Sequence, residues 1–173
     1  QTLSPGSGSV QVIGNLIQGN AAEAGDGGGV RLNSINGQEV EANRNQPNRW
    51  YQVNLYNNII ANNVAALAGG GISLQDAVRV NIIHNTIVHN DSTATAGEAF
   101  PPGVPTLSVP QPGAGIAARA HSAELMQYLT GGQPAYSNPT LTDNIVWQNR
   151  QFLFSGSASA ADPNLGQLPY GLC

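Results

Sequence analysis

His84 and Asp143 are the two residues whose types and positions best suit acid–base chemistry. Each directly precedes an asparagine in two similar segments, IIHNTIVHN from Ile82 and LTDNIVWQN from Leu141. If these segments lie side by side, the imidazole comes next to the carboxylate, and such a pair can serve as a general base or a weak metal ligand. The alternative, which we favour, is a surface hydrogen bond that fixes a turn. No serine or cysteine nucleophile accompanies the pair in a recognisable motif.

The two segments belong to a repeat that also occurs as VIGNLIQGN from Val12 and LYNNIIANN from Leu55. Its template is an aliphatic residue, two variable residues, Asn, one residue, Ile or Val, two residues, and Asn. Asparagine is depleted in ordinary strands, so its regular presence needs a partner. An amide both donates and accepts, so each one can bond the copies above and below it in a stack. The predicted ladders are Asn15, Asn58, Asn85 and Asn144 in one column and Asn20, Asn63, Asn90 and Asn149 in the other.

A second repeated element is a glycine cluster followed by an alternating apolar segment. It occurs as GDGGGVRL ending at Leu32, AGGGISL ending at Leu74 and PGAGIAA ending at Ala118. A glycine turn followed by period-two alternation predicts a turn and then a strand. One such unit is too thin to bury its own apolar face, so the units are expected to stack into a solenoid with a continuous aliphatic core. The predicted core columns are Val12, Leu55, Ile82 and Leu141, and Ile17, Ile60, Ile87 and Val146.

These repeats resemble those of right-handed parallel β-helix proteins of the pectate-lyase-like class. The segments NTIVHN and DNIVWQN and the GGGI turns are similar to the coils of bacterial surface and secreted β-helix proteins, including polymorphic outer-membrane and choice-of-anchor types. The resemblance covers roughly Val10 to Phe154 and is more specific for the fold than for a function. It implies an all-β, right-handed parallel β-helix with asparagine ladders and glycine-rich turns, a hand that the crossover rule for parallel strands also favours.

The expected organisation is a single domain over residues 1–173 that is interrupted by loops. A segment of the insertion before Asn138 is expected to form a short helix, capped by Ser122, running through Leu129 and ending at Gly131. The N-terminal QTLSPGSGS enters the first coil almost at once, so the chain is expected to be a segment of a longer protein or to dock at that end. The predicted parts are core coils over about 10–156, insertions at about 33–50, 93–112 and 119–138, and a C-terminal cap over 157–173 that uses Leu165, Leu168 and Tyr170.

The composition of the chain limits which classes of binding partner and which cellular location we expect. The formal charge is −4, charged residues make up 9% of the chain, and all six basic residues are arginines. Without a basic run, nucleic-acid binding is not expected, and no apolar stretch has the length of a transmembrane segment. The single cysteine, Cys173, either pairs with another chain or with sequence beyond this chain, or is an idle terminal thiol. A charge-poor solenoid without lysine suits the cell surface or the extracellular space.

Two classes of function are compatible with the resemblance. The first is a noncatalytic extracellular scaffold or interaction domain, adhesin-like or part of a surface assembly, that presents its loops to a protein partner or a glycan. The second is a polysaccharide lyase or glycoside hydrolase acting on a cell-wall or extracellular glycan, because enzymes of this shape use clustered acids with a basic residue. The first catalytic candidates would be His84, Asp143, Arg79 and Asp76.

Aromatic side chains offer another route to a glycan, since their flat faces can stack on sugar rings. The candidates, which are equally suited to anchoring insertions and capping the core, are Trp50, Tyr51, Tyr56 and Trp147. The run GDGGG is similar to glycine-rich calcium-binding repeats, but it contains one acid, Asp26, and the equivalent AGGGI contains none. We therefore expect neither a metal nor another cofactor.

Overall fold

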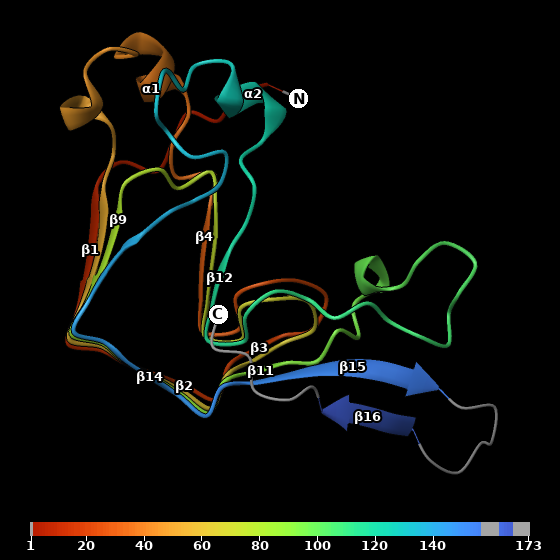
Figure 1. Cartoon of the computed structure of the whole chain (residues 1–173). Coiled ribbons are helices and arrows are strands. Elements are labelled where there is room, and N and C mark those ends of the chain that lie inside the picture. Colours follow the sequence, from red (N-terminus) through yellow and green to blue (C-terminus); the bar gives the residue numbers. More distant parts are fainter. Residues whose placement is uncertain (1, 157–162, 168–173) are drawn as a thin grey trace.

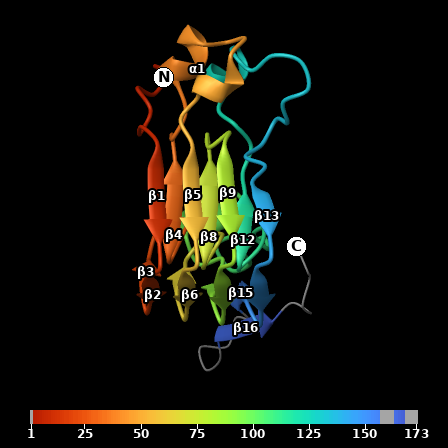
Figure 2. The same cartoon turned by 90° about the vertical axis from the view of Figure 1, so that its left-hand side faces the viewer.

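The computed structural model of the chain, which describes residues 2–156 and 163–167, is a parallel β-helix. In Figure 1 the chain descends along β1, crosses along β2 and rises along β4, and Figure 2 shows successive coils advancing from the β1 side to the β13 side. Together the two views give a right-handed coil, as predicted. The strands of the first two coils are β1 (Val10–Ile13), β2 (Leu16–Gln18), β3 (Ala21–Ala22), β4 (Val30–Asn33), β5 (Val53–Tyr56), β6 (Ile59–Ala61), β7 (Val64–Ala65) and β8 (Ile72–Gln75). Those that follow are β9 (Val80–Ile83), β10 (Thr86–Val88), β11 (Asp91–Ser92), β12 (Ile116–Ala118), β13 (Thr140–Thr142), β14 (Ile145–Trp147), β15 (Arg150–Gly156) and β16 (Pro163–Gln167).

Equivalent strands of successive coils form four sheets. Sheet A contains β1, β5, β9 and β13, and sheet B contains β2, β6, β10 and β14. Sheet C contains β3, β7, β11 and β15, to which β16 adds in antiparallel orientation, and sheet D contains β4, β8 and β12. Sheets A and D face each other across the core, and sheet B joins them at one end (Figure 1).

The predicted aliphatic columns form the core of the stack. Val12 pairs with Leu55, which pairs with Ile82 and then Leu141, and the second column runs in the same register through sheet B. The members in the two middle coils are fully buried: Leu55, Ile60, Ile82 and Ile87. The repeat alignment therefore predicted the register as well as the fold class.

Both asparagine ladders are present, and they satisfy the buried amides. The backbone N–H and Nδ2 of Asn63 both donate to Oδ1 of Asn90, at 3.0 and 2.9 Å. Nδ2 of Asn63 also donates to the carbonyl of Ile17 at 3.0 Å, and its Oδ1 accepts two bonds from Asn20. Asn58 and Asn85 repeat this pattern in the other column. Each interior amide thus joins three coils and leaves no polar atom unsatisfied.

Glycine is required where the chain passes from sheet C to sheet D. Equivalent turns of the first three coils use Gly27, Gly69 and Gly113 with positive φ, a backbone region that other residues adopt with strain. Gly70, the next residue of the second turn, lies against the backbone of Asp91 in the following coil, where a Cβ would come within 2.6 Å of the carbonyl carbon. The glycine clusters therefore allow successive coils to touch backbone to backbone.

The described insertions contain four short helical segments and one arrangement that the sequence did not indicate. They are α1 (Gln38–Ala42) and the 3-10 turn at Pro47–Arg49 in the first insertion, the 3-10 turn at Gly97–Ala99 in the second, and α2 (Ala123–Met126) in the third. The first insertion was expected to be a polar loop, but Val40 and Trp50 are buried together with Leu125 of α2. Figure 1 shows α1 and α2 side by side beyond the ends of the sheet A and sheet D strands.

The predicted cap of α2 is confirmed, whereas the predicted length is wrong. The Ser122 hydroxyl accepts a bond from the N–H of Leu125 at 3.3 Å, as an N-cap does. The helix ends at Met126 instead of Leu129, and the guanidinium of Arg44 binds the carbonyls of Gln127 and Tyr128 just beyond its end. Of the predicted C-terminal cap, Leu165 lies in β16, while Leu168, Tyr170 and Cys173 lie outside the described residues. Within the described part of the chain, no helix is long and apolar enough to cross a membrane.

Candidate functional site

The structure places His84 beside Asp143, as the repeat alignment predicted. Nδ1 of His84 lies 3.9 Å from Oδ2 of Asp143, at the turn between sheets A and B. Their side chains are 56% and 70% exposed, so water solvates both groups and screens their interaction. The separation exceeds that of a hydrogen bond. This geometry fits a solvated turn better than a general base.

Backbone conformation explains why His and Asp occur at this turn. The residue before each ladder asparagine has a positive φ in all four coils. Glycine, asparagine, aspartate and histidine are the residues enriched in this left-handed region. The two left-handed columns are Gly14, Asn57, His84 and Asp143, and Gly19, Asn62, His89 and Gln148. Conformation thus accounts for all of these residues except Gln148.

The other two catalytic candidates lie at the opposite end of β9. Arg79 precedes β9 and donates to the carbonyl of Trp50 at 2.9 Å and to Oε1 of Gln52 at 3.1 Å. Asp76 lies in the same turn, whereas His84 follows the end of the strand. Four strand residues span about 13 Å, so the structure does not bring the four candidates into one site.

Asp76 instead anchors the third insertion. Its Oδ1 accepts a 2.7 Å bond from the N–H of Ser122 and lies 3.4 Å from Nδ1 of the buried His121. This second contact does not have hydrogen-bond geometry, and Nδ1 of His121 has no hydrogen-bond partner among the described residues. Burial alone would raise the pKa of Asp76, but its interactions with His121 and Ser122 outweigh burial and hold that pKa below its ordinary value. The ionised carboxylate therefore stabilises the folded state.

Acid is expected to remove this contribution. Because the pKa of Asp76 is lower in the folded chain, its stabilisation is complete above about pH 4 and is lost as the pH falls through the folded-state pKa. Asp76→Asn should therefore lose less stability than the wild type between about pH 4 and pH 2. Urea unfolding followed by circular dichroism across this range measures the slope. An unchanged slope in Asp76→Asn would contradict the assignment.

The aromatic candidates divide into a buried tryptophan and an exposed one. Trp50 is 2% exposed, packs between α1 and α2, and donates from Nε1 to the carbonyl of Asn43 at 2.9 Å. It is therefore an anchor of the first insertion and cannot stack on a glycan. Tyr51 and Tyr56 are partly exposed. Trp147 is 59% exposed and lies edge-on to His89, with 5.8 Å between the ring centroids.

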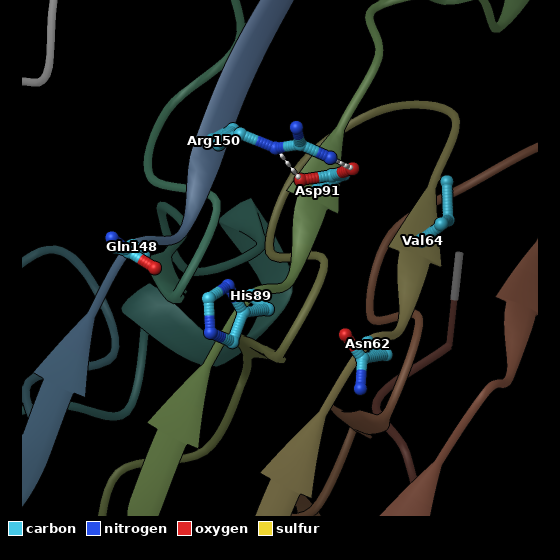
Figure 3. A pocket seen from close by; sticks show the side chains of 6 residues that line it. All are labelled: Asn62, Val64, His89, Asp91, Gln148 and Arg150. Atoms are coloured by element: carbon cyan, nitrogen blue, oxygen red, sulfur yellow. Dashed lines mark hydrogen bonds and ion pairs between the residues drawn. The ribbon is translucent and has the colours of Figure 1, made fainter.

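A shallow hollow of about 350 Å³ lies at the corner between sheets B and C (Figure 3), and His89, against which Trp147 lies, is one of its lining residues. The corner exists because each ladder asparagine points inward and its two neighbours in the chain point outward. In the stacked coils these neighbours form two outer rows. The residues with positive φ form one polar row, and the first residues of the sheet C strands form the other. The lining residues are Asn62, Val64, His89, Asp91, Gln148 and Arg150.

An ion pair closes one side of this hollow. Nε of Arg150 donates to Oδ1 of Asp91 at 2.9 Å, and Nη2 of Arg150 donates to Oδ2 at 2.6 Å (Figure 3). The guanidinium also lies 5.3 Å from the centroid of the Phe152 ring. Neither the hollow nor the ion pair was predicted, although the repeat alignment places Asp91 and Arg150 in one column. These opposite charges in adjacent coils could have indicated the ion pair from the sequence.

The acid of the GDGGG run has a structural role. Oδ1 of Asp26 accepts bonds from the N–H of Ala68 and from the guanidinium of Arg119, each at 2.9 Å. It thereby ties the first coil to the second and third. Over residues 2–156 and 163–167, no three His, Cys, Asp or Glu side chains are grouped so that they could hold a metal ion.

No protein-family profile matches the chain, and neither a curated protein nor a solved structure is detectably similar to it. The chemistry of the site must therefore be judged from its geometry. That geometry is an open, shallow outer surface with one exposed indole, amide side chains and one neutralised ion pair.

Proposed function

We propose that this chain is a noncatalytic extracellular scaffold or interaction domain, similar to the coils of bacterial surface and secreted β-helix proteins. The outer face of sheet B and the neighbouring hollow bind the partner, and the insertions are presented at the edges of the stack. The partner is a glycan or a protein of a surface assembly. The extracellular location is supported by the low charge and the absence of lysine in the sequence.

The observation that carries the proposal is the exposed apolar column on the outer face of sheet B. Leu16, Ile59 and Ile145 occupy equivalent positions in the first, second and fourth coils, with exposed fractions of 64%, 48% and 60%, and Thr86 occupies this position in the third coil. Trp147 extends the patch toward the hollow of Figure 3. Large apolar side chains that are exposed together on one face are a feature of interaction sites. A flat sheet face with an indole and nearby amides suits an extended partner.

The polysaccharide-cleaving alternative has weaker support. It requires a base and an acid at one reacting bond, inside a site that excludes water. His84 and Asp143 are solvated, while Asp76 and Arg79 bind other parts of the chain. Release of reducing ends, or of unsaturated products that absorb ultraviolet light, would nevertheless overturn the noncatalytic proposal if His84→Ala abolished it.

A binding experiment tests the role of sheet B. The wild type is run on native gels that contain neutral or acidic extracellular polysaccharides, and retardation gives the affinity. We expect Trp147→Ala to weaken binding by about tenfold, because exposed aromatic residues dominate such contacts. Tyr136→Ala is the matched control, since Tyr136 is an exposed aromatic residue of the third insertion. Equal retardation of the wild type and Trp147→Ala would contradict the assignment of this face.

A further inference from the structure

The first insertion begins with a chemically labile pair, Asn36-Gly37, which is the one Asn-Gly pair of the sequence. Asparagine is a labile residue, and glycine after it leaves the following nitrogen least hindered, because glycine has no Cβ. In deamidation the nitrogen of Gly37 bonds to Cγ of Asn36, the bond from Cγ to Nδ2 breaks, and ammonia leaves with the proton of the Gly37 N–H. Water then opens the cyclic imide and leaves aspartate or isoaspartate in place of the asparagine.

The fold uses the amide of Asn36 to close the first insertion. Asn36 is 1% exposed. Its Nδ2 donates to the carbonyl of Tyr51 at 3.0 Å and to Oε1 of Glu39 at 2.5 Å. Its Oδ1 accepts a bond from the N–H of Val78 at 2.7 Å. One side chain therefore joins the start of the insertion to its end and ties both to the turn before β9.

The fold also requires the glycine. A Cβ on Gly37 would overlap the carbonyl oxygen of Ser4, which accepts a bond from the N–H of Gln38 at 2.8 Å. The N–H of Gly37 donates to Oε2 of Glu39 at 2.8 Å. Packing thus selects glycine for space and asparagine for its hydrogen bonds, and together they make the labile pair.

We propose that Asn36 is a site of spontaneous deamidation that the folded first insertion keeps unreactive, and that its conversion releases this insertion irreversibly. In the folded chain Glu39 accepts bonds from both reacting groups, the attacking N–H of Gly37 and the leaving amide of Asn36. Attack on Cγ requires both groups to leave these bonds. Both residues are also buried, away from the water that completes the reaction. The reaction therefore proceeds through an opened insertion.

The product does not fit the closed insertion. An aspartate in place of Asn36 exchanges the donor of two hydrogen bonds for an acceptor. Its charge then lies against the carboxylate of Glu39 and the carbonyl of Tyr51, and like charges that are buried together are strongly unfavourable. An insertion that has opened and reacted does not close again, so Trp50 and Val40, which pack against α2, become exposed.

The rate of conversion in the folded and the unfolded chain tests the first half of the proposal. The chain is incubated at mildly alkaline pH, either folded or unfolded in urea, and then cut with trypsin. Mass spectrometry follows the peptide Leu32–Arg44, which contains Asn36, and fragmentation locates the modified residue. We expect conversion at Asn36 to be at least about tenfold slower in the folded chain, because only the opened fraction reacts. Equal rates in the two states would overturn the proposal.

Two substitutions in α1 test the role of Glu39. Glutamine at this position keeps one acceptor oxygen and cannot bond both reacting groups, so Glu39→Gln should speed conversion of the folded chain by about threefold or more. Its rate in urea should equal that of the wild type. Glu41→Gln makes the same change at an exposed residue of the same helix and should keep the wild-type rate in both states. A folded Glu39→Gln chain that reacts at the wild-type rate would contradict the role of Glu39.

Tryptophan fluorescence tests the release. Trp147→Phe leaves Trp50, which is 2% exposed, as the only tryptophan. In this background Asn36→Asp should shift the emission of Trp50 toward that of the unfolded chain, while the circular dichroism of the β-helix is retained. Asn33→Asp, which places the same charge on an exposed neighbour, should leave the emission unchanged.

Two outcomes of this experiment would overturn the release. The first is an unchanged Trp50 emission in Asn36→Asp. The second is a loss of circular dichroism together with the emission shift, since the change would then not be confined to the insertion. The inference is independent of the function proposed above, because it concerns the base of the first insertion instead of the face of sheet B.

Discussion

Asn90→Ala is expected to lower the free energy of unfolding by about 3 kcal/mol. Its side chain accepts the backbone N–H and the Nδ2 of Asn63 and donates to the carbonyl of Ile60 and to Asn149. Alanine leaves the N–H of Asn63 and the carbonyl of Ile60 without these partners. Each buried unsatisfied group costs about 1–3 kcal/mol. Urea unfolding followed by circular dichroism measures the loss.

Asn15→Ala is the matched control for this substitution. Asn15 makes the same kind of ladder bonds in the other column, but it lies in the first coil, is exposed and accepts no bond at Oδ1 among the described residues. Water can replace the bonds that it donates, so the expected loss is below about 1 kcal/mol. Equal losses in the two variants would show that the ladders contribute through something other than buried amide hydrogen bonds.

Gly70→Ala is expected to destabilise the chain by about 3 kcal/mol or more, or to prevent folding. The added Cβ would overlap the backbone of Asp91, with the carbonyl carbon at 2.6 Å and the nitrogen at 2.7 Å. Backbone atoms inside a sheet cannot rotate away as a flexible side chain can. The second and third coils would have to separate locally, which would strain the ladder step from Asn63 to Asn90. The yield of soluble protein and the thermal unfolding midpoint measure the effect.

Gly97→Ala provides the comparison for the glycine prediction. Gly97 begins the 3-10 turn of the second insertion, its φ is not positive, and an added Cβ meets no atom within 4 Å. Alanine at such a site changes stability by less than about 1 kcal/mol and can stabilise by restricting the unfolded chain. If Gly70→Ala were as mild as Gly97→Ala, the close backbone contact between coils would be wrong.

The coil and its register could be predicted because one template constrains every step. A ladder asparagine is useful only opposite another asparagine, and an inward aliphatic residue only above another one, so alignment of the repeats is equivalent to strand pairing. The insertions carry no such constraint. The sequence left Trp50 open as a glycan-stacking residue or an anchor of an insertion, because nothing in its neighbourhood indicates that α1 and α2, far apart in the sequence, pack together around it.

The candidate site was harder to predict, for a specific reason. Left-handed turns select histidine and aspartate for their backbone conformation, and acid–base sites select the same residues for their chemistry. The alignment placed His84 beside Asp143, but solvent exposure depends on the whole fold, and exposure is what weakens the catalytic interpretation. The ion pair between Asp91 and Arg150 is the opposite case, because the repeat alignment alone places these two opposite charges in adjacent coils.

The geometry of the asparagine ladders does not depend on how many residues separate one ladder asparagine from the next in the sequence. Successive asparagines of the first column are 43, 27 and 59 residues apart in the sequence. The distances from the backbone N of one to Oδ1 of the next are nevertheless 3.0, 2.9 and 2.8 Å. Loop closure entropy grows only with the logarithm of loop length, so added residues cost little. Evolution or protein engineering can therefore add foreign segments at the insertion points while the spacing between coils stays constant.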